Sequence, residues 1–119
     1  MSVKTSDLEE VKLSLRKFAD ERDWNKFHSP KNLAMALAGE AGELLEIFQW
    51  LTEAQSRRLP SRDLKKVEEE LADVLLYLIR LSDQLKIDLL AAAQEKLIVN
   101  ARKYPVHKAR GTSKKYTEL

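Results

Sequence analysis

Glycine and proline are scarce in this chain, with three of each among 119 residues. Both interrupt helices, glycine through its backbone entropy and proline through its missing N–H. Their scarcity favours long uninterrupted helices over a fold of strands and turns. A chain of this length has no room for a second independent core, so we expect a single domain over residues 1–119.

Apolar side chains recur at helical intervals in four segments of the sequence. Ser6 and Glu9 have capping-box spacing ahead of the first segment, and Ser29-Pro30 gives the second an N-cap residue and a proline at the first helical position. The residue before Pro105 disfavours helical dihedral angles and ends the fourth. We therefore predict an all-α four-helix bundle with helices at about residues 7–21, 30–51, 62–86 and 88–104, a polar turn over 52–61, a helical core over about 7–105 and an irregular basic tail over 106–119.

The third predicted helix is apolar on more than one side. From Leu71 to Leu81 its apolar residues lie nearly all round the helix, which is more than one buried stripe requires. Four helices of this length also make a thin bundle with a limited core. The surplus apolar surface predicts association between copies of the chain.

Composition and charge indicate which cellular compartment and which kinds of partner to expect for the protein. The sequence has no cysteine, which excludes disulfides and thiolate metal sites and fits a reducing cytoplasm. No apolar run approaches the roughly 20 residues of a membrane span, and no signal-peptide core precedes the first helix. The stretch from Lys96 to Lys115 carries lysine and arginine without aspartate or glutamate. This stretch either binds a polyanion, such as nucleic acid or a polyphosphate, or is simply a basic end exposed to solvent. We expect a cytoplasmic protein without a membrane or nucleic-acid partner, because the basic residues are mostly confined to one end beside an acidic centre.

Two pairs of carboxylates stand out in the second and third predicted helices. Glu40 and Glu43 lie three residues apart, as do Glu70 and Asp73, so each pair shares a helix face. Such pairs are common on solvated faces, but both of these interrupt strongly apolar stretches. Four carboxylates held together repel one another, and a bound divalent cation relieves that repulsion. Oxygen ligands alone suit Mg²⁺ or Mn²⁺.

Neighbouring residues bear on this hypothesis. Gly39 and Gly42 each cost roughly 1 kcal/mol against alanine inside a helix, so we expect the backbone of the third helix to approach closely there. A di-iron site of the ferritin type requires histidine three residues after glutamate on two helices. Neither His28 nor His107 stands in that relation to a glutamate, so we set that site aside.

Further residues follow the same helical stripes. Trp50 lies seven residues after Glu43, and Tyr77 lies four after Asp73. In the fourth predicted helix Lys96, Asn100 and Lys103 form a polar stripe at i, i+4 and i+7. The aromatic residues are either core side chains or the wall of a nucleotide pocket with cations facing it, and periodicity alone leaves both open.

The sequence resembles a known family. Glu-x-x-Glu, a helical spacer and Glu-x-x-Asp form the signature of the MazG-like all-α nucleoside triphosphate pyrophosphohydrolases. Over residues 8–119 the resemblance is closest to the dCTP pyrophosphatase branch. The blocks that carry it include Glu21-Arg22-Asp23-Trp24, Phe27-His28, Gly42-Glu43-Leu44, Phe48-Gln49-Trp50, Glu69-Glu70-Leu71, Asp73-Val74-Leu75, Tyr104-Pro105-Val106-His107 and Lys115-Tyr116-Thr117.

The resemblance implies an activity and roles for particular residues. Family members hydrolyse a nucleoside triphosphate between the α- and β-phosphates, giving the monophosphate and pyrophosphate, and related enzymes act as tetramers, which predicts a homotetramer built as a dimer of dimers. By this resemblance Mg²⁺, with Mn²⁺ as a substitute, binds at the four carboxylates, and the carboxylates are the catalytic residues. The candidate substrate-binding residues, of which Trp24 and Trp50 resemble the residues that enclose the base, are Trp24, His28, Trp50, Tyr77, Lys96, Asn100, Lys103 and Tyr104. Glu43 is our hypothesis for the residue that accepts a proton from the attacking water, with Glu46 as the less favoured alternative.

One departure from the family pattern leaves the identity of the substrate's base undetermined. Where the animal dCTP-preferring enzymes carry a histidine in the first helix, this chain has Leu15. We therefore expect dCTP or 5-modified dCTP as substrate, with dUTP or a broad set of triphosphates as the alternative. The alternative from a different functional class is a non-catalytic nucleotide-binding or scaffold protein. The retention of all four carboxylates argues against it. The tail from His107 to Leu119 either closes over a site or is disordered.

Overall fold

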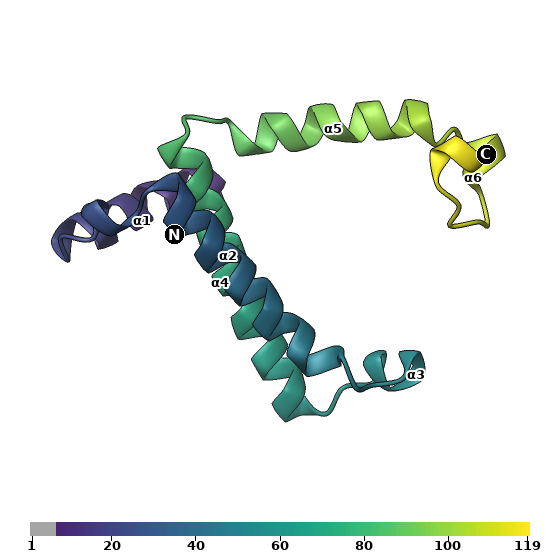
Figure 1. The fold of residues 1–119 in the computed structure, drawn as a ribbon, viewed down its shortest axis with the longest axis horizontal. Coiled ribbons are helices and arrows are strands. Elements are labelled where there is room, and N and C mark those ends of the chain that lie inside the picture. Colours follow the sequence, from purple (N-terminus) through teal and green to yellow (C-terminus); the bar gives the residue numbers. More distant parts are fainter. Residues whose placement is uncertain (1–6) are drawn as a thin grey trace, which may run out of the picture. The chain divides into compact units, whose positions relative to one another are not determined.

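The computed structural model describes residues 7–119, and it is all-α over these residues. Four helices are long, and no strand occurs in the described part of the chain, so the predicted fold class is confirmed (Figure 1). The elements are α1 (Leu8–Glu21), η1 (Asn25–Phe27), α2 (Pro30–Phe48), α3 (Glu53–Ser56), α4 (Ser61–Gln84), α5 (Leu89–Lys103), α6 (Val106–Ala109) and η2 (Tyr116–Glu118), where η marks a 3₁₀ helix.

Side-chain caps explain where most helices begin. Ser29 accepts a hydrogen bond from the N–H of Asn32 at the start of α2, as predicted, and Asp88 caps α5 in the same way. The first helix is capped by Asp7, whose side chain accepts from the N–H of Glu9. Ser6, the predicted cap, lies outside the described residues. A carboxylate at this position also complements the positive end of the helix dipole.

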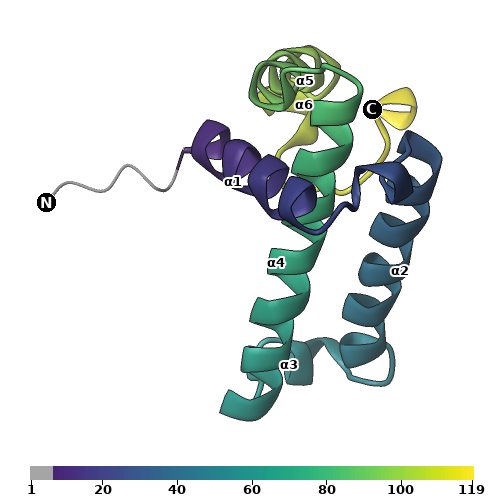
Figure 2. The same ribbon diagram turned by 90° about the vertical axis from the view of Figure 1, so that its left-hand side faces the viewer.

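The segment between α2 and α4 is more ordered than predicted. The second helix ends at Phe48, three residues before its predicted end. Thr52 then forms a capping box with Gln55 and begins the one-turn helix α3 inside the stretch predicted as a polar turn. Helix α3 therefore joins the ends of two antiparallel helices, α2 and α4, which lie side by side in both views (Figures 1 and 2).

The chain divides into two compact units, the first ending at Ile87 and the second running from Asp88 to Leu119. In the first, α2 packs along α4, and α1 packs against α4. Its buried apolar residues, among those that the structure describes, are Ala19, Leu33, Val67 and Ile79. A core of four residues is small for three long helices, and the carboxylates predicted to bind metal lie on two of these helices.

The second unit folds its tail back onto its own helix. Apart from the single turn of α6 and the η2 segment, residues 106–119 are irregular. Tyr116 returns to the C-terminal end of α5, where its ring meets that of Tyr104 edge to face at 5.9 Å. The Nζ atom of Lys103 lies 4.8 Å from the centre of the Tyr116 ring. The tail thus contacts two of the candidate substrate-binding residues.

None of the helices described in residues 7–119 combines the length and the apolar character that crossing a bilayer requires.

Helix α4 ends in a conformation that favours glycine but holds lysine. Lys86 has a φ of 58°, and the N–H of Ile87 donates to the carbonyl of Ser82 at 2.9 Å, as in a Schellman motif. Because a side chain in the left-handed region costs about 1 kcal/mol or more, Lys86→Gly is expected to raise the free energy of unfolding by about 1 kcal/mol. Urea denaturation measures the change. Lys86→Ala keeps the Cβ atom and should change little, so equal stabilities of the two variants would contradict this explanation.

Candidate metal centre and active site

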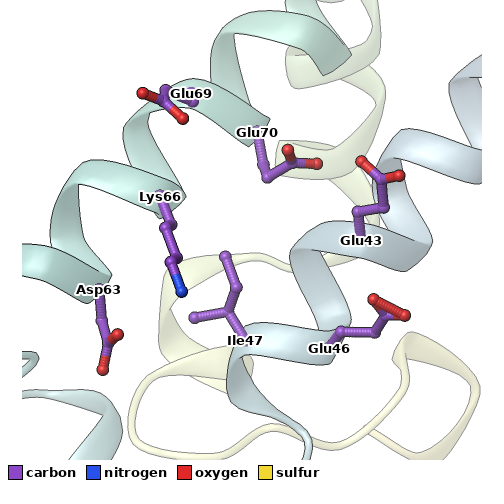
Figure 3. Close-up of a pocket in the computed structure, with 7 residues that line it drawn as sticks. All are labelled: Glu43, Glu46, Ile47, Asp63, Lys66, Glu69 and Glu70. Atoms are coloured by element: carbon purple, nitrogen blue, oxygen red, sulfur yellow. The ribbon is translucent and has the colours of Figure 1, made fainter.

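Three of the four predicted carboxylates meet between α2 and α4. Glu40, Glu43 and Glu70 each offer one carboxylate oxygen, and these oxygens all lie within 4.8 Å of one another. The side chains of Glu43 and Glu70 point toward each other across the gap between the helices (Figure 3). Asp73, one turn further along α4, is not one of these three, but its charge acts on Glu40. The antiparallel packing of two helices thus brings together residues 30 positions apart.

The carboxylate cluster is electrostatically strained. One oxygen of Glu40 and one of Glu70 are buried without a hydrogen-bond partner among the described residues. Burial, and then the neighbouring carboxylate of Glu43, raise the pKa of Glu70 to about 7. The same two causes raise the pKa of Glu40, to which the charge of Asp73 adds a smaller increase. Desolvated carboxylates that repel one another are stabilised by a cation, so these residues fit a divalent metal ion.

The donor set indicates which metals fit. All three side chains provide carboxylate oxygens, the hard ligands that Mg²⁺ and Mn²⁺ prefer. The sequence has no cysteine, and no histidine belongs to the cluster. The carboxylate cluster therefore suits a magnesium-type ion better than zinc.

The interpretation of the two glycines on α2 is wrong. A Cβ atom built at Gly39 or Gly42 would meet no heavy atom within 4 Å. Both positions are exposed, so α4 does not approach the α2 backbone there. The buried apolar residues of the two helices are instead Leu33 on α2 and Val67 and Ile79 on α4.

A cleft of about 420 Å³ adjoins the carboxylate cluster. It begins at Glu43 and Glu70 and is also lined by Glu46, Ile47, Asp63, Lys66 and Glu69 (Figure 3). Asp63, Lys66 and Glu70 follow one another at i, i+3 and i+7, hence on one face of α4. The sequence shows that spacing, but it does not show whether this face of α4 is turned toward α2, so the sequence alone does not predict the cleft. Glu46, the alternative proton acceptor, lines the cleft with Glu43.

The two tryptophans predicted to enclose a base lie at opposite ends of α2. Trp24 precedes η1 and contacts Phe18 and His28, with ring centres 5.6 Å and 6.2 Å away. Trp50 lies two residues beyond the C-terminal end of α2 and is 86% exposed. A helix of 19 residues is about 28 Å long. Within one chain the two indole rings therefore cannot enclose the same base.

The other predicted residues fall in both units. Tyr77 is half-buried on α4 in the first unit. Lys96, Asn100 and Lys103 share a face of α5 in the second, where Asn100 and Lys103 are half-buried. Tyr104 ends that helix, and its N–H donates to the Asn100 carbonyl at 2.9 Å. The predicted polar stripe of α5 is thus present in the second unit.

The raised pKa of Glu70 predicts how stability depends on pH. Its value of about 7 exceeds the ordinary 4.5, so between these pH values the folded protein holds a proton that the unfolded chain releases. Stability should therefore fall as pH rises through this window. With EDTA present, Tm should be lower at pH 8 than at pH 6, and Mg²⁺ should raise Tm at pH 8. Glu70→Gln should flatten the pH dependence, and an equally steep slope in this variant would contradict the assignment.

Comparisons with known proteins agree on one family. The model of the MazG-like family matches residues 36–119. Human dCTP pyrophosphatase 1 is 46% identical over 114 residues, which cover 94% of this chain and 67% of the human protein. Mouse dCTP pyrophosphatase 1 is 45% identical with the same coverage. The crystal structure of a pyrophosphatase from Archaeoglobus fulgidus superimposes with a TM-score of 0.78 at 45% identity, covering 82% of this chain and 92% of the archaeal one.

Proposed function

The chain belongs to the MazG-like family, and from this premise we propose that it hydrolyses a deoxynucleoside triphosphate between its α- and β-phosphates. The products are the monophosphate and pyrophosphate. Its similarity to dCTP pyrophosphatases and to an archaeal pyrophosphatase identifies it as an enzyme, a nucleoside triphosphate diphosphatase. The observation that carries the proposal is the pair of buried carboxylate oxygens, on Glu40 and Glu70, that have no hydrogen-bond partner among residues 7–119 and belong to a cluster beside a cleft.

The carboxylate cluster would hold the metal. Glu40, Glu43 and Glu70 supply oxygens close enough to share an ion, and we propose Asp73 as a fourth ligand. Mg²⁺, or Mn²⁺ in its place, would neutralise phosphate charge and lower the pKa of bound water. Within the cleft the carboxylate of Glu43 accepts the proton of the attacking water, since it lies both in the carboxylate cluster and in the cleft wall. Glu46 remains the alternative acceptor from the same wall.

The substrate we propose is dCTP or a 5-modified dCTP, in the clean-up of nucleotide pools. The support is similarity, because the matched human, mouse, rat and bovine proteins are all dCTP pyrophosphatases. Leu15 stands on α1 where the animal enzymes have a histidine, so dUTP or a broad set of triphosphates is the alternative. No particular observation favours a non-catalytic scaffold.

We propose that the working enzyme is a homo-oligomer, built as a dimer of dimers. Large apolar side chains remain exposed along α2 and α4, among them Met35, Leu45, Leu64 and Leu71. The separation of Trp24 and Trp50 also requires a second copy if both are to contact one base. In this assembly residues 1–119 act as one domain. Sedimentation that shows a monomer at micromolar concentration would overturn the oligomer proposal.

One assay tests the activity directly. Pyrophosphate release is measured with Mg²⁺ over a panel of natural and 5-substituted triphosphates, with Glu40→Gln run beside the wild type. Release by the wild type alone supports the proposal and identifies the base. Failure to hydrolyse any member of the panel would defeat it.

A further inference from the structure

A buried arginine joins α4 to the connector between α1 and α2. The side chains of Arg80 and Asp83 are 7% and 8% exposed, and the Nη1 atom of Arg80 lies 3.6 Å from a carboxylate oxygen of Asp83. Asp83 also accepts two hydrogen bonds from Arg16 on α1, at 2.8 Å and 2.6 Å. A buried charge is expensive unless it is paired and hydrogen-bonded, so the position of Arg80 is closely constrained.

The remaining donors of Arg80 reach the connector. Its Nε–H donates to Nδ1 of His28 at 3.1 Å, and its Nη2 donates to the side-chain oxygen of Asn25 at 2.6 Å. Asn25 in turn donates to Asp20 on α1 at 2.5 Å. A single guanidinium therefore fixes the first residue of the η1 turn, Asn25, and the residue that follows the turn, His28.

These contacts determine where the proton of His28 resides. A guanidinium only donates hydrogen bonds, so Nδ1 of His28 must accept and carry no proton. Burial, and then the charge of Arg80, lower the pKa of His28, so the imidazole is neutral near pH 7. A neutral ring with a bare Nδ1 carries its proton on Nε2. Nε2 makes no hydrogen bond to any residue between 7 and 119, so this N–H is free to donate to a ligand.

The imidazole of His28 lies beside Trp24, a residue that the family resemblance assigns to the base. The ring of His28 meets that of Trp24 at an interplanar angle of 68°, and Trp24 is 42% exposed. We propose that Arg80 is a positioning residue of the base subsite, because it holds His28 as the neutral Nε2–H tautomer beside Trp24. The subsite thereby presents a fixed donor to an oxygen or ring nitrogen of the base. This inference rests on the proposed function, in which Trp24 contacts the base.

The wild-type protein provides the first test. The sequence holds two histidines, so ¹⁵N NMR of the wild type and of His107→Gln assigns both imidazoles. We expect His28 at pH 7.5 to show a protonated Nε2 and an unprotonated Nδ1. A dominant Nδ1–H tautomer would overturn the proposal whatever the variants do, and this readout does not depend on the protein hydrolysing any triphosphate.

Arg80→Met then removes the donor while keeping much of the apolar stem. Both tautomers of His28 should become populated, and the midpoint of its titration should rise because the nearby positive charge is gone. The KM for dCTP should rise on the order of tenfold with kcat changed less than about threefold, as expected when an interaction that positions the bound substrate is lost. Arg80→Lys keeps the charge but not the planar fork, and it provides a second variant if Arg80→Met does not fold.

Arg16→Met is the matched control. Arg16 contacts Asp83 from the exposed side of the same network and touches neither His28 nor Asn25. In Arg16→Met the tautomer and the titration of His28 and the KM for dCTP should therefore match those of the wild type. An unchanged His28 spectrum in a folded Arg80 variant, or a changed spectrum with unchanged KM, would overturn the proposal. The same rise in KM in Arg16→Met would reduce Arg80 to a purely structural role.

Discussion

Glu43→Gln is expected to reduce turnover by roughly 10²–10⁴-fold, the range lost when a general base is removed. Glutamine keeps an oxygen where Glu43 points at Glu70 (Figure 3), but it does not accept a proton from water. The variant should still bind Mg²⁺, with weakened affinity. The rise in Tm that Mg²⁺ causes measures this binding. Pyrophosphate release at saturating dCTP and increasing Mg²⁺ measures the loss, and added Mg²⁺ should not restore it.

Two neighbouring substitutions separate proton transfer from metal binding. Glu70→Gln removes a proposed ligand from the facing helix, so part of its lost activity should return at high Mg²⁺. Glu46→Gln changes the other carboxylate of the same cleft wall and should retain most of the turnover. If Glu43→Gln loses less than about tenfold while Glu46→Gln loses more, the proton acceptor is Glu46 and the hypothesis for Glu43 is wrong.

Local sequence patterns were sufficient to predict the four long helices. Capping residues and apolar periodicity act within a few positions, so Ser29 identified the start of α2, and the predicted start of α5 is correct within one residue. The same reasoning placed two carboxylate pairs on two helix faces. It could not tell how closely the carboxylates of the two pairs approach one another, because that depends on how far α4 is rotated about its own axis when it packs on α2.

Features that depend on tertiary packing were missed or misinterpreted. The sequence predicts a close helix approach at Gly39 and Gly42, yet a Cβ atom at either position would meet no heavy atom within 4 Å. Lys66 was not singled out, because its role in a cleft requires a facing helix. Arg80 contacts residues 52 and 55 positions away, and no periodicity in the sequence connects such positions. The exposed apolar surface, in contrast, was anticipated from the all-round apolar character of residues 71–81.

Trp24→Ala and Trp50→Ala should each lower kcat/KM for dCTP by roughly 10- to 100-fold, since stacking a base on an aromatic ring is worth about 1–3 kcal/mol. Because α2, which is about 28 Å long, lies between the two residues, we expect each base to contact Trp24 of one copy and Trp50 of another.

Mixed oligomers of the two variants test this arrangement. In a random 1:1 mixture, about a quarter of such shared sites would combine an intact Trp24 with an intact Trp50. Co-refolding the two variants should therefore restore up to about a quarter of the wild-type kcat/KM, although each variant refolded alone stays impaired. If both rings of a site came from the same chain, every site would keep one substitution and mixing would restore nothing. A lack of recovery in co-refolded oligomers would thus show that the copies do not share the base, and at least one of the two tryptophans would lose its assignment to it.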